Sequence, residues 1–236
     1  MTQPFRGGKR YDSIIWSGVS LHLLDDRIEA RCPERLYALS SAIHPGGFSY
    51  SNRIVNWKVP LTYQCDDPVR DIVRQCGEWG CDSNDTIGLI TAAKLTHASI
   101  TELEGDRFKL LCCTTVGTRN AARAGLPRST FSAYSPGTIN TIILIDGQMT
   151  EAAMVNAIIT ATEAKTAALQ QLGIVEKVNG ESATGTTTDA IVIGVSQAAS
   201  WNAVHAYAGA ATTIGCAIGE TVYETVLEAA RTQQED

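Results

Sequence analysis

The chain has 236 residues, of which 44% are hydrophobic, and its formal net charge at pH 7 is -6. A chain of this size can bury a sizeable core, and we expect one domain spanning 1–236. The negative charge argues against a nucleic-acid partner, because binding phosphates requires clustered lysine and arginine. The sequence has neither a signal-peptide pattern nor an apolar run of membrane-spanning length, so we expect a cytoplasmic protein with no membrane partner.

The first half of the chain has the alternation and turn residues of antiparallel strands. A hairpin is expected around Asp25-Asp26, and the acidic pair before Pro68 predicts a helix that ends near Gly77. Residues 1–13, like 233–236 at the other end, are expected to be frayed. Further strands are predicted at 36–43, 53–59, 86–92, 98–103 and 108–116.

The second half alternates short apolar strands with long helices. Strands are expected at 140–145 and 190–195, and helices near 150–173, with Thr150 as the N-cap, and 203–231. These elements predict an α+β fold: a largely antiparallel sheet, as one sheet or two stacked sheets, covered by the two long helices. One apolar face of the first long helix is expected to hold Val155, Ile158, Ile159, Thr162, Thr166 and Leu169.

A stripe of small residues begins the last predicted helix, at Ala208, Thr212, Gly215 and Gly219. Small side chains let a neighbouring helix or sheet approach closely, so we interpret this stripe as a packing surface. Together with the modest net charge, it also permits a homodimer.

Three polar segments lie at the edges of predicted elements in the second half. Gly137–Thr141 (GTINT) opens a strand, and Gly185–Asp189 (GTTTD) directly precedes another. Such loops can direct N–H groups and hydroxyls at a carbonyl or a developing oxyanion, although ordinary turn chemistry explains each loop about as well. Glu163 and Lys165 fall at opposite margins of one helix face, where charges are usually solvated.

The histidine with the most distinctive context is His44, at a break between two extended runs and beside Gly46-Gly47. An imidazole there suits general acid–base chemistry, and bonding to the local backbone is the equally plain alternative. The sequence contains no G-x-S-x-G elbow, no H-E-x-x-H helix and no convincing set of metal ligands, so we expect no metal site.

Seven motifs occur in order along the chain: Ser40-Ser41-Ala42, Gly46-Gly47, Thr91-Ala92-Ala93, GTINT at 137–141, TEAK at 162–165, ATGTTTDA at 183–190 and YAGAATTIG at 207–215. Together they give the chain a close resemblance to the adenosylcobinamide amidohydrolases, over about residues 36 to 230. At His44-Pro45 the chain departs from the Asn-Gly-Gly type of sequence expected of that family.

The resemblance implies hydrolysis of the amide that joins the aminopropanol arm of adenosylcobinamide to the corrin ring. The products would be adenosylcobyric acid and 1-amino-2-propanol, which returns incomplete corrinoids to cobalamin synthesis. The cobalt would belong to the corrinoid substrate, so no cofactor of the protein's own is expected. The alternatives are a corrinoid-binding carrier or sensor without turnover, and an amidohydrolase that acts on a smaller amide.

Amide hydrolysis needs an activated nucleophile, an oxyanion site and a proton for the amine. We assign Glu163 to water activation or leaving-group protonation, Lys165 and Asn140 to the carbonyl and oxyanion, and Asp189 to holding the loop or Lys165. A serine or threonine nucleophile among Ser41, Thr138, Thr186 and Thr187 is the rival chemistry. The residues expected to bind substrate are Ser41, His44, Gly46, Gly47, Thr91, Thr138, Thr162, Gly185, Thr186, Thr187 and Thr188.

Overall fold

A computed structural model describes residues 3–127 and 137–235. Three α-helices accompany a curled sheet of nine strands, a mixed α+β architecture as expected. The α-helices are α1 (Pro68–Glu78), α2 (Glu151–Gln171) and α3 (Thr213–Thr232), and three short 3-10 turns are η1 (Pro4–Arg6), η2 (Ser83–Asp85) and η3 (Leu95–His97). The strands of the large sheet are β1 (Arg10–Asp12), β2 (Ser20–Leu23), β3 (Arg27–Ser40), β4 (Gly47–Lys58), β5 (Thr86–Thr91), β6 (Ser99–Glu104), β7 (Lys109–Val116), β9 (Ile139–Asp146) and β12 (Ala190–Val195).

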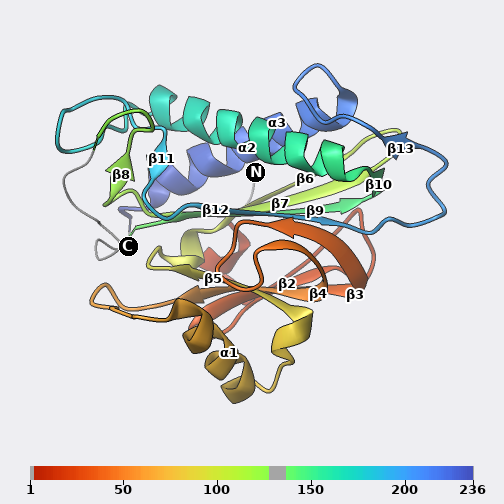
Figure 1. Ribbon diagram of the computed structural model, residues 1–236, viewed down its shortest axis with the longest axis horizontal. Helices are drawn as coiled ribbons and strands as arrows, with labels where there is room; N and C mark the ends of the chain where they lie inside the picture. Colours follow the sequence, from red (N-terminus) through yellow and green to blue (C-terminus); the bar gives the residue numbers. More distant parts are fainter. Residues whose placement is uncertain (1–2, 128–136, 236) are drawn as a thin grey trace.

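Four layers result from the curl of the sheet (Figure 1). Helices α2 and α3 cover strands β12, β9, β7 and β6, and below these strands lies a second layer of β2 to β5 with α1 beneath it. One hydrophobic core fills the space between the two long helices and the sheet, and a second fills the space between the two strand layers. The expected stacked sheets are therefore the two halves of one continuous sheet.

Strand β3 makes the connection between the two layers. A register shift between Arg31 and Leu36 bends it, so that its first half pairs with β2 and its second half pairs with β12, while β4 follows it on the other side. Most pairings are antiparallel, but β4 pairs with β5, and β12 with β9, in parallel. Helix α2 provides the crossover between β9 and β12, which are buried from both faces and are correspondingly apolar.

The inward face of α2 differs from the predicted one. Val155 and Ile159 are 48% and 50% exposed, whereas the buried positions include Ala153, Ala157 and Lys165. Alanines let α3 and the sheet approach α2 closely, and larger β-branched side chains would hold them apart. Of the predicted apolar face, Val155 and Ile159 therefore lie on the outer side of α2, whereas Leu169 is buried and Ile158 is half-buried against the core.

The last helix begins ten residues later than predicted. Val204–His205 forms strand β13, which pairs in parallel with β10 (Gln148–Met149), and α3 starts only after its N-cap Thr212. Pairing with β10 therefore overrides helix formation at residues 204–205. The small-residue stripe does serve packing: a Cβ added to Gly215 would lie 2.1 Å from the Gly209 carbonyl oxygen, and one added to Gly219 would be in ordinary contact, at 3.7 Å, with Thr160 of α2.

Both ends of the described part make specific contacts with the rest of the protein. Phe5 is 2% exposed in the core between the strand layers, and β1 pairs with β2. At the other end, the side chain of Gln233 accepts hydrogen bonds from Thr118, and Glu235 forms an ion pair with Arg6 at 2.7 Å. Residues 1–2 and 236 lie outside the described part. None of the described helices has the length and apolar character needed to cross a bilayer.

Candidate active site

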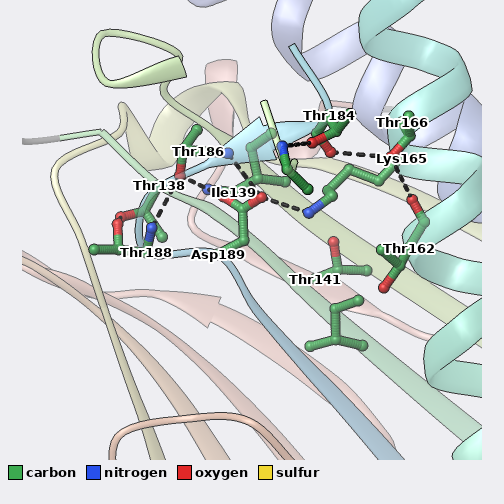
Figure 2. A network of polar contacts seen from close by, with 12 residues as sticks. Thr138, Ile139, Thr141, Thr162, Lys165, Thr166, Thr184, Thr186, Thr188 and Asp189 are labelled. Carbon is green, nitrogen blue, oxygen red and sulfur yellow. Dashed lines mark hydrogen bonds and ion pairs between the residues drawn. The ribbon is translucent and has the colours of Figure 1, made fainter. Parts of the chain in front are cut away.

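The carboxylate of Asp189 joins three of the segments that the sequence singled out (Figure 2). Its Oδ2 lies 2.5 Å from the Lys165 ammonium of α2 and accepts from the Thr186 backbone N–H at 2.9 Å. Its Oδ1 accepts from the Ile139 N–H at the start of β9, at 3.0 Å, and from the Thr186 hydroxyl. Four donors therefore fix this side chain, and through it the Gly185 loop, β9 and α2 are held together.

The Lys165–Asp189 ion pair is buried, with the two side chains only 9% and 11% exposed. A lysine on the inner face of a helix needs such a partner, because an unpaired buried charge is costly. Gly185 makes the close approach feasible: a Cβ there would lie 2.4 Å from Asp189 Oδ2 and 2.8 Å from Lys165 Nζ. Glycine, which begins the short strand β11 (Gly185–Thr186), is the residue that fits this space.

Two threonine hydroxyls lie together on the outer side of this network. Thr138 Oγ1 and Thr188 Oγ1 are 2.7 Å apart, and each is within hydrogen-bonding distance of the Gly137 carbonyl, at 2.7 and 2.9 Å. Thr138 immediately precedes Ile139, and Thr188 immediately precedes Asp189, so the Asp189 contacts fix the backbone of both threonines.

Both threonines line a cleft of about 240 Å³ where β5, β9 and the loop before α1 meet. The lining is mostly apolar, and the two threonines are among its few polar residues. The residues that line it are Ile43, Val59, Pro60, Tyr63, Gln64, Cys65, Pro68, Ile90, Thr91, Ala92, Gly137, Thr138 and Thr188. We call it the threonine cleft.

The wall formed by the loop before α1 carries Tyr63 and Cys65. Both donate to the carboxylate of Asp71 in the first turns of α1. The hydrogen bonds from Cys65 and then Tyr63 lower the pKa of Asp71, and burial is the main cause that raises the pKa of Tyr63. Because Asp71 accepts both hydrogen bonds, this wall is a hydrogen-bonded unit tied to α1.

Several exposed apolar side chains belong to the segments that line the threonine cleft. Ile43 lines it directly, Leu61 follows its lining residue Pro60, and Val69 and Val73 lie on α1 just after its lining residue Pro68. An exposed aliphatic side chain at a cleft, such as Ile43, suits contact with an apolar ligand.

Of the residues assigned to catalysis, the structure brings together Lys165 and Asp189 but not the other two. Glu163 is exposed, and its side chain has no hydrogen bond or ion pair with a described residue. Asn140 is 1% exposed beneath the cleft, where its amide donates to Asn56 Oδ1 at 2.8 Å and to the Ile90 carbonyl at 3.0 Å. Asn140 thus connects the two strand layers at this point.

The residues assigned to substrate binding divide into three groups. Thr91, Thr138 and Thr188 line the threonine cleft, while Gly185, Thr186 and Thr187 build the loop beside it. The rest do not line it. The Ser41 hydroxyl accepts a hydrogen bond from the Ile191 backbone, and the His44 ring is hydrogen-bonded to the Ser83 carbonyl. Gly46 and Gly47 lie where β3 turns into β4. The exposed Thr162 donates to the Ile158 carbonyl within α2.

Sequence reasoning missed several residues of the site. Asn56 could have been found from the sequence, because it stands between apolar residues of a predicted strand and a buried amide needs a hydrogen-bond partner within the core. In the structure, the Asn56 side chain bridges Asn140 and Thr115. Asn120, whose amide donates to Thr187 at 2.7 Å, lies in a loop without a distinguishing pattern. Tyr63 and Cys65 are equally unmarked in the sequence. Among the described residues, no group of three or more His, Cys, Asp or Glu side chains is arranged to hold a metal ion.

Comparison with known proteins identifies the family. A family model described as adenosylcobinamide amidohydrolase matches residues 18–236. The chain belongs to the adenosylcobinamide amidohydrolase family. The family match covers the threonine cleft, the Lys165–Asp189 pair and both long helices, and it places the chain among the amidohydrolases.

Two relatives are similar to this chain over more than half of its length. A protein named adenosylcobinamide amidohydrolase from Methanosarcina mazei is 30% identical over 195 residues, 80% of this chain and 87% of that protein. An uncharacterized protein of Methanocaldococcus jannaschii is 33% identical over 168 residues, 64% of each chain. Among solved structures, a Burkholderia sp. beta-aminopeptidase aligns over 86% of this chain and 78% of its own, at 12% identity and a TM-score of 0.41, a value too low to bear on fold or function.

Proposed function

We propose that this family member hydrolyses the amide between the corrin ring and the aminopropanol arm of adenosylcobinamide. Water adds to the amide carbonyl and the C–N bond breaks, so that adenosylcobyric acid and 1-amino-2-propanol leave. The reaction would return incomplete corrinoids to cobalamin synthesis. The family match supports the amidohydrolase class, and the observation that carries the site assignment is the Thr138–Thr188 hydroxyl pair in a cleft of suitable size.

The dimensions of the threonine cleft fit the arm of this substrate and not its ring. Pockets for drug-sized ligands enclose roughly 300–1,000 Å³, and a corrin ring with its side chains is larger than such ligands. A volume of about 240 Å³ accommodates an amide with a short alcohol. The ring would then rest on the exposed apolar residues around the cleft, where remote contacts supply binding energy for the chemical step.

The threonine hydroxyls are the groups that we assign to the scissile carbonyl. An amide is a poor electrophile, and hydrogen bonds to its oxygen that strengthen as negative charge develops lower the barrier. In this proposal Thr138 and Thr188 turn their hydroxyl protons from each other and from the Gly137 carbonyl to the scissile carbonyl oxygen. Asp189 and Lys165 act as positioning residues, because Asp189 already has four donors and fixes the backbone beside both threonines.

The cobalt in this proposal enters with the corrinoid as part of the substrate, and no step uses a metal or cofactor held by the protein. The sequence-based role of Glu163 in water activation predicts a large loss of turnover in Glu163→Gln. Its exposed position outside the cleft predicts near-normal turnover instead, and we adopt the second expectation.

The test replaces each hydroxyl with a methyl group of nearly the same shape. Thr138→Val and Thr188→Val are expected to lower kcat by about 100-fold, the usual cost of one oxyanion donor. Thr162→Val is the matched control, since this exposed threonine lies outside the cleft and bonds only within its helix. Turnover of both cleft variants within about threefold of the wild type would contradict the assignment.

A panel of truncated amides without the corrin ring distinguishes the ring-dependent reaction from hydrolysis of a smaller amide. The proposal predicts that kcat/KM falls steeply when the ring is removed, because the apolar surroundings of the cleft then have nothing to bind. Equal kcat/KM values for truncated and full amides would favour the smaller substrate. Quantitative recovery of unchanged adenosylcobinamide would instead indicate a carrier.

A further inference from the structure

A second cleft adjoins the threonine cleft and lies at the C-terminal end of α3. Its volume is about 320 Å³, and four residues line both clefts: Val59, Pro60, Ala92 and Gly137. Its other lining residues are Lys58, Leu61, Ala93, Lys94, Val116, Gly117, Arg119, Gln233 and Gln234. The shared lining makes the two clefts direct neighbours in the fold.

The second cleft is basic, with three exposed cationic residues in its lining, in a protein whose formal net charge is -6. Lys58, Lys94 and Arg119 line it, and its described lining contains no aspartate or glutamate. Lys58 and Arg119 have no side-chain partner among the described residues, whereas Lys94 donates to the backbone carbonyl of Glu235. The nearby Glu235 carboxylate is engaged by Arg6, at 2.7 Å.

The three cations come from separate elements that the sheet brings together. Lys58 ends β4, Lys94 follows β5, and Arg119 follows β7. Like charges are unfavourable when close together, so a cleft that collects three of them without a carboxylate is best compensated by an anion. Arginine offers a planar fork for two phosphate oxygens, and lysine adds a point charge.

We propose that this basic cleft is a subsite for an anionic group, specifically a phosphate ester on the amine arm of the substrate. The inference rests on the proposed function, because it requires the arm to lie in the threonine cleft. The scissile amide would bind at Thr138 and Thr188, and the alcohol end of the arm would reach Lys58 and Arg119. The protein would then accept amides whose departing amine carries a phosphate, and would bind them more tightly than the unesterified arm.

The test measures equilibrium binding, which does not depend on turnover. The probes are 1-amino-2-propanol and its O-phosphate, titrated against the whole protein by ligand-observed NMR. The phosphate ester is expected to bind at least about tenfold more tightly, as expected for charge-assisted hydrogen bonds, and the difference should shrink with rising salt. Lys58→Gln and Arg119→Gln should each remove most of it.

Lys177→Gln is the matched control, since it removes an exposed lysine from the loop between α2 and β11, outside both clefts. It should leave the preference for the ester unchanged, and the unesterified amine serves as the internal reference for every variant. Inorganic phosphate alone is expected to bind more weakly than the ester, because it lacks the arm that occupies the first cleft.

Three results would overturn the proposal: equal affinity for the ester and the free amine, an equal loss in Lys177→Gln, or inorganic phosphate binding as tightly as the ester. Hydrolysis of adenosylcobinamide, assayed in parallel, separates this inference from the proposed function. If the protein hydrolyses adenosylcobinamide but shows no preference for the ester, only the anion subsite fails. If it binds the ester selectively but does not hydrolyse adenosylcobinamide, the function fails and the basic cleft remains.

Discussion

Replacing either partner of the Lys165–Asp189 ion pair should lower the free energy of unfolding, and replacing Asp189 should lower it more than replacing Lys165. Asp189→Asn leaves the Lys165 ammonium buried with no other partner among the described residues, and an uncompensated buried charge costs about 3–5 kcal/mol. Lys165→Met leaves the Asp189 carboxylate with three remaining donors, from Thr186 and Ile139. We expect about 2–3 kcal/mol for that change, since part of the charge stays compensated.

The free energy of unfolding can be followed by tryptophan fluorescence in guanidinium chloride, because the chain has four tryptophans. The double variant Lys165→Met with Asp189→Asn buries no charge, so its loss should be smaller than the sum of the two single losses by about 1–3 kcal/mol. A larger loss for Lys165→Met than for Asp189→Asn would refute this reasoning. So would a loss below about 1 kcal/mol for both.

Three other predictions concern the site and the sheet that supports it. Gly185→Ala should lower the free energy of unfolding by about 1–3 kcal/mol and remove most of the activity, because the added Cβ would lie 2.4 Å from Asp189 Oδ2. The control is Gly77→Ala, where a Cβ meets open space on α1, and this change should be neutral or stabilising in the same unfolding assay. Asn140→Leu should cost about 2 kcal/mol by leaving buried acceptors unpaired, and a loss of kcat at unchanged stability would instead favour its catalytic role. Burial opposes ionisation of Glu29, but three arginines outweigh it and lower its pKa below the ordinary 4.5. Its contribution to stability is therefore present above pH 4.5 and lost as pH falls through the lowered pKa, so an acid titration of unfolding free energy should be flatter for Glu29→Gln.

Local sequence patterns predicted most of the elements, because strands such as β9 and β12 are apolar runs and Thr150 is a good helix cap. They failed for the orientation of α2. Its hydrophobic residues gave the expected face, but the close contact with α3 selects the alanine face, and only the position of α3 decides between the two. The start of α3 failed for the same kind of reason, since residues 204–205 pair with a strand far away in the sequence.

The candidate site was predicted only in part. The GTINT and GTTTD segments do meet, because the parallel pairing of β9 with β12 places their starts side by side. The wall that carries Tyr63 and Cys65 comes from the first half of the chain, and no local pattern links it to Thr138. Such a cleft depends on the curl of the sheet, which arises from the long, bent β3 and has no short sequence signature.

The central claim is that the chain breaks one particular amide bond. Incubation of the purified protein with adenosylcobinamide in water labelled with heavy oxygen, followed by mass spectrometry, tests it most directly. We predict equal amounts of 1-amino-2-propanol and adenosylcobyric acid, with one labelled oxygen atom in the new carboxylate and a loss of about 100-fold in the rate for Thr138→Val. Unchanged adenosylcobinamide with protein that binds it would contradict the account.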